Sequence, residues 1–133
     1  MRIVVAAAMI DGLGRVLLQR RPEGKQHGGL WEFPGGKVEA GEGPVQALIR
    51  EIDEELGVAL SAADITPLSF AHADDSSGAP PILLLLYVCR LWKGEPVCEK
   101  NAMLKWAGRQ EISTFPMPPL DVPLAKAVLA LLK

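Results

Sequence analysis

The stretch from Gly36 to Val58 constrains the fold of this chain more than any other part of the sequence. A glycine-rich segment, residues 35–43, is followed there by a segment with helical periodicity. Pro44 suits the first turn of a helix, because its missing N–H would lack an intrahelical partner there in any case. Gly57 suits the C-terminal cap, where a left-handed residue is common. We therefore predict a glycine-rich loop that leads into a helix between Pro44 and Gly57.

The predicted helix has an apolar face and an acidic flank. Its apolar residues recur at helical spacing: Val45, Leu48, Ile49, Ile52 and Leu56. Glu51, Glu54 and Glu55 fall together beside that face, Glu42 lies just before the helix, and Arg50 is its only basic residue. Like charges three or four residues apart destabilise an isolated helix by about 0.2–0.5 kcal/mol per pair. The acidity makes sense if a hard divalent cation such as Mg2+ or Mn2+ supplies the positive charge.

The overall composition fits one domain over residues 1–133. With 49% hydrophobic residues the chain can bury a core and is too apolar for a disordered protein. A net charge of −2 without a basic block argues against a nucleic-acid polymer as partner. The longest apolar run, residues 80–89, is too short to cross a membrane as a helix. Cys89 and Cys98 have no metal-type spacing, and without a secretory signal we expect free thiols in the reducing cytoplasm.

The rest of the chain alternates strands and turns and ends in a second helix. We predict strands over residues 2–10, 15–21, 65–73, 82–92 and 102–107, the first two joined as a hairpin by the turn at 11–14. Residues 30–33 are a short apolar and aromatic segment that leads into the glycine-rich loop. We expect loops over residues 22–29 and 74–81. The first of these includes Lys25. A third loop is expected over residues 115–123, where four prolines stiffen the chain. The last helix is predicted over 123–132. Strands between two well-separated helices favour an α/β fold in which helices enclose a mixed sheet.

The stretch from Gly36 to Val58 resembles the signature of the Nudix hydrolase family, G-x5-E-x7-R-E-U-x-E-E-x-G-U with U aliphatic. All nine specified positions are filled: Gly36, Glu42, Arg50, Glu51, Ile52, Glu54, Glu55, Gly57 and Val58. Further segments resemble the MutT branch of that family: Arg20-Arg21, residues 31–37, residues 92–96 and Phe115-Pro116. The resemblance implies the Nudix α/β/α sandwich with a mixed central β-sheet.

The resemblance also implies an activity. MutT-like enzymes hydrolyse nucleoside triphosphates to the monophosphate and pyrophosphate with Mg2+, for which Mn2+ can substitute. We expect 8-oxo-dGTP as substrate, in sanitation of the nucleotide pool for DNA replication and repair. Alternatives are another nucleotide (CTP, a modified pyrimidine triphosphate or a dinucleotide) and a non-catalytic nucleotide-binding module. A monomer or a homodimer is expected.

The resemblance assigns metal ligands to the acidic flank. Glu51, Glu54 and Glu55 would bind the metal, with the Gly35 carbonyl as an additional ligand. Glu51 or Glu54 would also orient or deprotonate the attacking water. Glu99 is a candidate for a further carboxylate. Counting back from Trp106 without a gap puts Lys100 at the matching position, so Glu99 is either a ligand or an ordinary surface residue.

Further residues are expected to support the metal site. Gly36 and Glu42 belong to the signature and would support the glutamates. Arg50 would hold them in place by charge-assisted hydrogen bonds; the alternative is an ordinary surface ion pair.

Substrate-binding residues are expected outside the signature. Arg21 and Lys37 lie where the family has phosphate-facing cations, although each could equally be a solvated surface charge. Phe33 would line the base pocket or pack in the core, and the two are compatible. Asp121 would read the base by hydrogen bonds, or it would cap the following helix.

Overall fold

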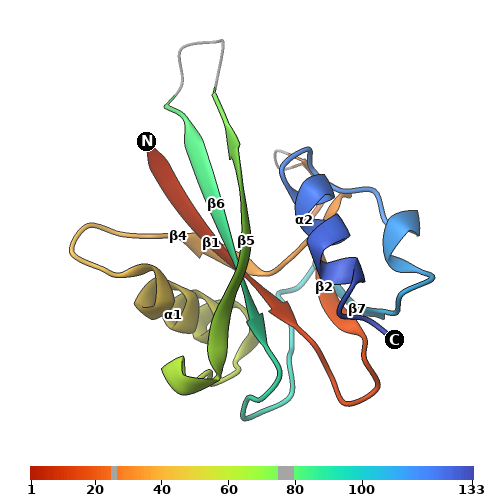
Figure 1. The fold of residues 1–133 in the computed structure, drawn as a ribbon. Coiled ribbons are helices and arrows are strands. Elements are labelled where there is room, and N and C mark those ends of the chain that lie inside the picture. The colour runs from red at the N-terminus through yellow and green to blue at the C-terminus, as the bar shows by residue number, and fades with distance from the viewer. Residues whose placement is uncertain (25–26, 75–79) are drawn as a thin grey trace.

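The computed structural model describes residues 1–24, 27–74 and 80–133, with β-strands between two α-helices (Figure 1). In chain order the elements are β1 (Arg2–Met9), β2 (Val16–Arg20), β3 (Trp31–Glu32), β4 (Gly35–Lys37), α1 (Pro44–Leu56), the 3-10 turn η1 (Ala62–Asp64), β5 (Ile65–Ala73), β6 (Ile82–Cys89), β7 (Met103–Ala107), the 3-10 turn η2 (Ile112–Thr114) and α2 (Asp121–Leu129).

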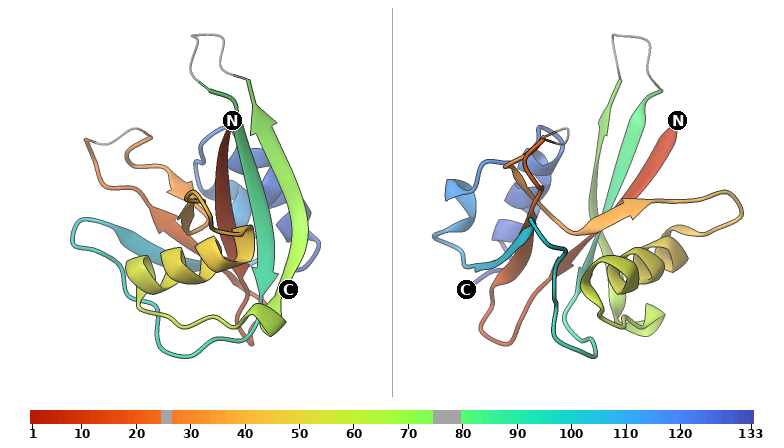
Figure 2. Two further views of the ribbon diagram at one scale, coloured as in Figure 1. Left: turned by 90° about the vertical axis from the view of Figure 1, so that its left-hand side faces the viewer. Right: turned by 180° about the vertical axis from the view of Figure 1, so that it is seen from behind.

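The strands form two sheets. The larger sheet has the order β4-β1-β6-β5, and the smaller sheet has the order β3-β2-β7. The larger sheet is mixed, because β1 pairs with β6 in parallel while β1 and β4, and likewise β5 and β6, are antiparallel. Both views of Figure 2 place α1 and α2 on opposite sides of the strands. The prediction of an α/β fold with a mixed sheet between helices is therefore confirmed.

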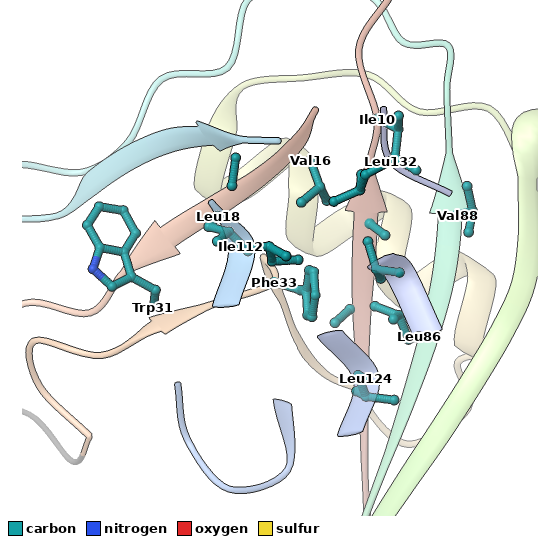
Figure 3. Packing of buried hydrophobic residues seen from close by; sticks show 14 of the residues in the cluster. Ile10, Val16, Leu18, Trp31, Phe33, Leu86, Val88, Ile112, Leu124 and Leu132 are labelled. Carbon is teal, nitrogen blue, oxygen red and sulfur yellow. The ribbon is translucent and has the colours of Figure 1, made fainter. Parts of the chain in front are cut away.

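Alternation along β1 divides the core between the two helices. The side chains of Val5, Ala7 and Met9 pack with the buried face of α1. Ala6 and Ala8 point the other way and belong to a second cluster, which includes Leu124 of α2 (Figure 3). Each face of this strand is apolar because each is covered by a helix, which explains why its sequence shows no polar alternation.

The predicted hairpin between the first two strands is wrong. The turn itself is present, since the Asp11 N–H donates to the Arg15 carbonyl and the Gly14 N–H donates to the Asp11 carbonyl. Beyond one bridge between Ile10 and Val16, however, β1 and β2 separate into different sheets. β1 instead lies between β4 and β6. Short-range turn chemistry predicts a reversal of the chain, but it does not say that the two strands stay paired.

The predicted loop over residues 35–43 is wrong at its start, because Gly35–Lys37 forms β4. This strand pairs with β1 at very close approach: a Cβ on Gly35 would lie 1.9 Å from the Val5 carbonyl oxygen. Glycine is needed there for proximity of the two backbones rather than for a turn. The pairing ties the start of the Nudix-like segment to the central sheet.

Two predicted element ends also differ from the structure. β6 ends at Cys89 instead of continuing to residue 92, because its neighbours provide no ladder partner beyond Met9 and Ile65. α2 begins at Asp121, inside the predicted loop 115–123, and ends at Leu129. Pro123 is compatible with its first turn, where the backbone N–H groups lack intrahelical partners.

Parts of two predicted loops lie outside the described residues. These are residues 25–26, which include Lys25, and residues 75–79 of the predicted loop 74–81. The flanking residues Asp74, Pro80 and Pro81 belong to no helix or strand. Within the described ranges, neither helix is long and apolar enough to span a membrane.

Candidate active site

Helix α1 carries the acidic flank and is fixed at both ends. Pro44 occupies its first turn, and Gly57 closes it in the left-handed region with φ of 68°. The Gly57 N–H donates to the Asp53 carbonyl at 3.0 Å. The helix buries Ala47, Leu48, Ile52 and Leu56 against the central sheet. Because the apolar face is anchored in this way, the glutamates on its flank have a fixed direction.

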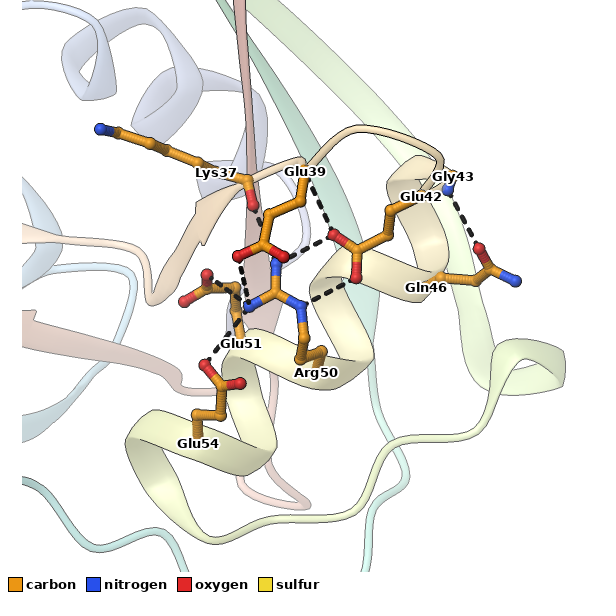
Figure 4. Close-up of polar contacts among 8 residues, drawn as sticks. All are labelled: Lys37, Glu39, Glu42, Gly43, Gln46, Arg50, Glu51 and Glu54. Atoms are coloured by element: carbon orange, nitrogen blue, oxygen red, sulfur yellow. Dashed lines mark hydrogen bonds and ion pairs between the residues drawn. The ribbon is translucent and has the colours of Figure 1, made fainter.

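Arg50 is the centre of a hydrogen-bonded network on this helix (Figure 4). Its Nε and Nη2 donate to the two carboxylate oxygens of Glu42, at 2.8 and 2.9 Å. Its Nη1 donates to Glu51 at 2.9 Å and to Glu54 at 3.3 Å. Nη2 also donates to the Lys37 carbonyl at 3.0 Å, which joins α1 to β4. This bidentate, multiply bonded guanidinium has the geometry of an orienting residue rather than of an isolated surface ion pair.

The glutamates of this flank differ in pKa according to their surroundings. Hydrogen bonds from Arg50, together with one from the Glu39 backbone, lower the pKa of Glu42 to about 2. Burial raises the pKa of Glu55 to about 8, and the charges of Glu51, Glu32 and Glu99 add to this effect. A backbone hydrogen bond from Gly35 opposes the rise only in part. Glu55 therefore lies where several carboxylates concentrate negative charge.

The glycines of β4 lie beside these carboxylates. A Cβ on Gly36 would lie 2.2 Å from the carboxyl carbon of Glu51, so only a glycine leaves that side chain its place. Glu99 reaches the same region because its loop is tied to the end of α1: the Val97 N–H donates to the Leu56 carbonyl at 3.0 Å. The charges of Glu51 and Glu99 thus both act on Glu55, with Gly35 and Gly36 alongside.

The arrangement fits a divalent cation. A cation would favour the ionised form of Glu55, which burial and the neighbouring carboxylates oppose. In the described part of the chain, however, no three His, Cys, Asp or Glu side chains are already grouped as a metal site. Arg50 contributes to this separation, because it holds one oxygen of Glu51 and one of Glu54. Rotation of these long side chains would be needed to bring their remaining oxygens to a common ion.

Asp121 is the one buried charged residue among the described residues, with 5% of its surface exposed. Its Oδ2 accepts a hydrogen bond of 3.2 Å from the Phe33 N–H. Burial raises the pKa of the carboxyl to about 7, the Phe33 N–H and Arg21 oppose the rise, and Glu32 adds to it. The alternative that Asp121 caps α2 is wrong, because α2 has no side-chain cap and Asp121 lies inside its first turn.

The remaining predicted substrate residues lie in different settings. Arg21 pairs with Glu32, its Nε lying 2.8 Å from Oε1. The Phe33 side chain is only 3% exposed and packs in the core, so its backbone rather than its ring reaches Asp121. Lys37 is exposed, and its side chain extends away from the glutamates of α1 (Figure 4). The structure therefore brings Arg21, Phe33 and Asp121 together and leaves Lys37 apart.

Glu32 was not among the predicted site residues. It lies between two buried aromatic residues in the sequence, Trp31 and Phe33, and points to the opposite side of β3. The signal for its position was present, since a single charged residue between two core aromatics must face away from the core they share. Its charge acts on both Glu55 and Asp121.

Comparison with known proteins gives consistent results. The model of the NUDIX domain matches residues 1–131. The CTP pyrophosphohydrolase of Escherichia coli is 35% identical over 131 residues, covering 97% of this chain and 93% of that protein. The 8-oxo-dGTP diphosphatase of Haemophilus influenzae is 35% identical over 129 residues, covering 96% and 91%. A solved MutT structure, from work on Aliivibrio salmonicida and Vibrio cholerae, superposes with a TM-score of 0.81 at 28% identity and covers 97% of each chain.

Proposed function

This chain belongs to the Nudix hydrolase family, and we propose that it is a divalent-metal-dependent nucleoside triphosphate pyrophosphohydrolase, releasing a nucleoside monophosphate and pyrophosphate. The observation that carries the proposal is the acidic flank of α1, where Arg50 holds Glu42, Glu51 and Glu54 while Glu55 lies partly buried beside them. Such a group of carboxylates, on a helix anchored by its apolar face, suits metal-assisted attack on a phosphoanhydride.

The proposed mechanism assigns one task to each part of the site. Glu51, Glu54, Glu55 and Glu99, with the Gly35 carbonyl, would hold Mg2+, for which Mn2+ could substitute. A bound divalent cation neutralises phosphate charge and lowers the pKa of a bound water. Glu51 or Glu54 would orient or deprotonate the attacking water. Arg50 keeps these carboxylates in position through the hydrogen bonds described above.

The substrate-binding residues would lie between the two helices. Arg21 contacts the phosphates, while Asp121 and the backbone beside Phe33 bind the base. We retain Lys37 as an outer phosphate contact, reached by rotation of its exposed side chain. We assign the reaction to the cytoplasm, which suits the free thiols of Cys89 and Cys98.

We propose 8-oxo-dGTP as the first candidate substrate. Similarity to the Haemophilus influenzae 8-oxo-dGTP diphosphatase supports it. The chemistry of Asp121 also suits this base, whose N7–H donor lies beside the O6 acceptor. A carboxyl group accepts a hydrogen bond in either state and donates one when protonated, and burial makes protonation of Asp121 accessible near neutral pH.

CTP or a modified pyrimidine triphosphate is the second candidate. The similarity to the Escherichia coli CTP pyrophosphohydrolase supports it directly. Cytosine also presents a donor, its amino group, beside an acceptor, N3. Asp121 therefore complements both bases, and the relative rates of hydrolysis have to distinguish them.

A nucleotide panel tests the proposal. Purified protein would be assayed with Mg2+ and with 8-oxo-dGTP, dGTP, CTP, dCTP, 5-methyl-dCTP and a dinucleotide, and pyrophosphate and monophosphate would be quantified. We expect pyrophosphate and monophosphate in equal amounts, with the highest kcat/KM for 8-oxo-dGTP. A highest kcat/KM for a cytosine nucleotide would select the second candidate. Binding without turnover of any nucleotide would contradict the enzymatic proposal.

A further inference from the structure

Glu32 occupies a position between the two ends of the proposed site. It lies in β3, where it pairs across the ladder with Gln19 of β2. Its neighbours Trp31 and Phe33 are 9% and 3% exposed and pack on the α2 side of the molecule. Because side chains alternate along a strand, Glu32 points to the other side, on which α1 packs. The buried aromatics on either side hold this backbone in place.

An ion pair joins Glu32 to Arg21, the residue that follows β2. The Nε of Arg21 donates to Oε1 of Glu32 at 2.8 Å, and the side chains are 39% and 21% exposed. An ion pair with this exposure contributes little to folding stability. Its more important consequence is geometric, because a hydrogen bond through Nε fixes the direction of the whole planar guanidinium.

The chain neighbours of Glu32 place this pair between the two helices. The Phe33 N–H, one residue on, donates to Asp121 in the first turn of α2 at 3.2 Å. Gly36, four residues on, lies against the Glu51 side chain of α1. If the base binds at Asp121 and the phosphates bind at α1, as proposed above, the nucleotide passes this pair with the phosphate that carries the nucleoside.

We propose that Glu32 is a positioning residue for substrate binding: its ion pair with Arg21 directs the guanidinium toward the phosphate that carries the nucleoside. The inference rests on the proposed function and extends it to a residue outside the Nudix signature. Glu32 acts through Arg21, to whose Nε its Oε1 is already bound. It should therefore influence the affinity for nucleotides more than the chemical step.

The first test is Glu32→Gln, which keeps the size of the side chain and a hydrogen-bond acceptor but removes the charge. We expect KM for the preferred nucleotide to rise roughly tenfold while kcat stays within about twofold of the parent, because an interaction made equally with substrate and transition state is lost. The matched control is Glu95→Gln, an exposed glutamate in the turn after β6. A fall in kcat at unchanged KM, or a higher Mg2+ requirement, would make Glu32 part of the metal site and overturn the proposal.

A double-mutant cycle tests whether Glu32 acts through Arg21. Glu32→Gln, Arg21→Gln and the double variant would be compared by kcat/KM, with melting temperatures to verify folding. We expect the double variant to match Arg21→Gln within about twofold, because Glu32 has no task once the guanidinium is absent. Independent, multiplying effects of the two substitutions would contradict the proposal.

Calorimetry with a non-hydrolysable nucleotide separates this inference from the proposed function. A triphosphate with a methylene group between the α and β phosphorus atoms would be titrated into the parent, Glu32→Gln and Glu95→Gln proteins. We expect the Kd to rise roughly tenfold for Glu32→Gln only. If the parent binds this analogue but hydrolyses no nucleotide, the enzymatic proposal fails and the Kd values still decide the role of Glu32. Equal Kd values for all three proteins, or no binding by the parent, would overturn the inference.

Discussion

The pKa of each carboxyl group in this site is set by its immediate surroundings rather than by its residue type. Arg50 lowers the pKa of Glu42 to about 2, so that this carboxyl remains a charged partner at any physiological pH. Burial raises the pKa of Glu55 to about 8 and that of Asp121 to about 7. The first residue thus serves as a permanent anion, whereas the other two change protonation state when a cation or a base approaches.

The stability of the protein should record the ionisation of Asp121. Its pKa is about 7 in the folded protein, compared with an ordinary value of 3.8. Between these two pH values the folded protein keeps a proton on Asp121 that the unfolded chain has lost. Stability contributed by Asp121 therefore decreases as pH rises from about 4 to about 7, by at most about 1.4 kcal/mol per pH unit. The Asp121→Asn variant can still accept a hydrogen bond from the Phe33 N–H, but its side chain does not titrate, so it does not lose this stability as the pH rises.

Urea unfolding of the parent and Asp121→Asn proteins between pH 4 and pH 8 measures the effect. We expect the variant to gain stability relative to the parent up to about pH 7 and then to keep a constant advantage. Titration of Glu55 is common to both proteins and cancels in the difference. A difference that does not change with pH would show that Asp121 is ionised throughout the range.

Residue roles were predictable from sequence to different degrees. The resemblance implied that Arg50 holds the glutamates of α1, and the structure places Glu51 and Glu54 at its guanidinium as expected. The contact between Phe33 and Asp121 joins residues 88 positions apart, and no local pattern contains it. Rejection of the helix-cap role of Asp121 therefore needed the tertiary structure, and its contact with the base stays a prediction.

At the scale of elements, α1 was predicted in full because every local signal agreed. Pro44, Gly57 and the apolar period all specify the same helix, and it runs from Pro44 to Leu56. β4 was missed because paired glycines resemble a turn, although here they allow a close approach to Val5. The separation of β1 from β2 was missed for a similar reason, since the partners of a strand are chosen by the whole sheet.

A substitution in β4 tests whether this strand fixes the position of the Glu51 carboxyl on α1. In Gly36→Ala the new methyl group would lie 2.2 Å from the carboxyl carbon of Glu51, so that flexible carboxyl must move. We expect kcat to fall by about a hundredfold, as for a catalytic group misplaced by about 1 Å. Melting temperature should change little, because the end of a side chain moves rather than the backbone.

The matched control for this substitution is Gly12→Ala. Its Cβ would meet no atom within 4 Å, and its backbone is not left-handed. Rates of pyrophosphate release and melting temperatures of both variants would be compared with the parent. Full activity in Gly36→Ala would mean that the position of Glu51 is not important for the reaction.

At the scale of the whole molecule, the fold places two helices with different tasks on opposite sides of one mixed sheet (Figure 2). α1 carries the carboxylates proposed for the metal, and α2 brings Asp121 to the backbone of Phe33. Residues 33–36 connect the two helices, because the Phe33 N–H donates to Asp121 while Gly36 of β4 lies against the Glu51 side chain. The general α/β arrangement was predictable from element order, whereas the division of the strands into two sheets was not.

The central claim is that the acidic flank of α1 holds the metal that supports hydrolysis. The most direct measurement is the rate of pyrophosphate release against Mg2+ concentration for the parent, Glu54→Gln and Asp53→Asn, the last being an exposed neighbour on the same helix. We expect saturable Mg2+ activation abolished by EDTA in the parent, the same curve for Asp53→Asn, and a rate at least about a hundredfold lower for Glu54→Gln. Full activity of Glu54→Gln, or release that persists in EDTA, would contradict the account.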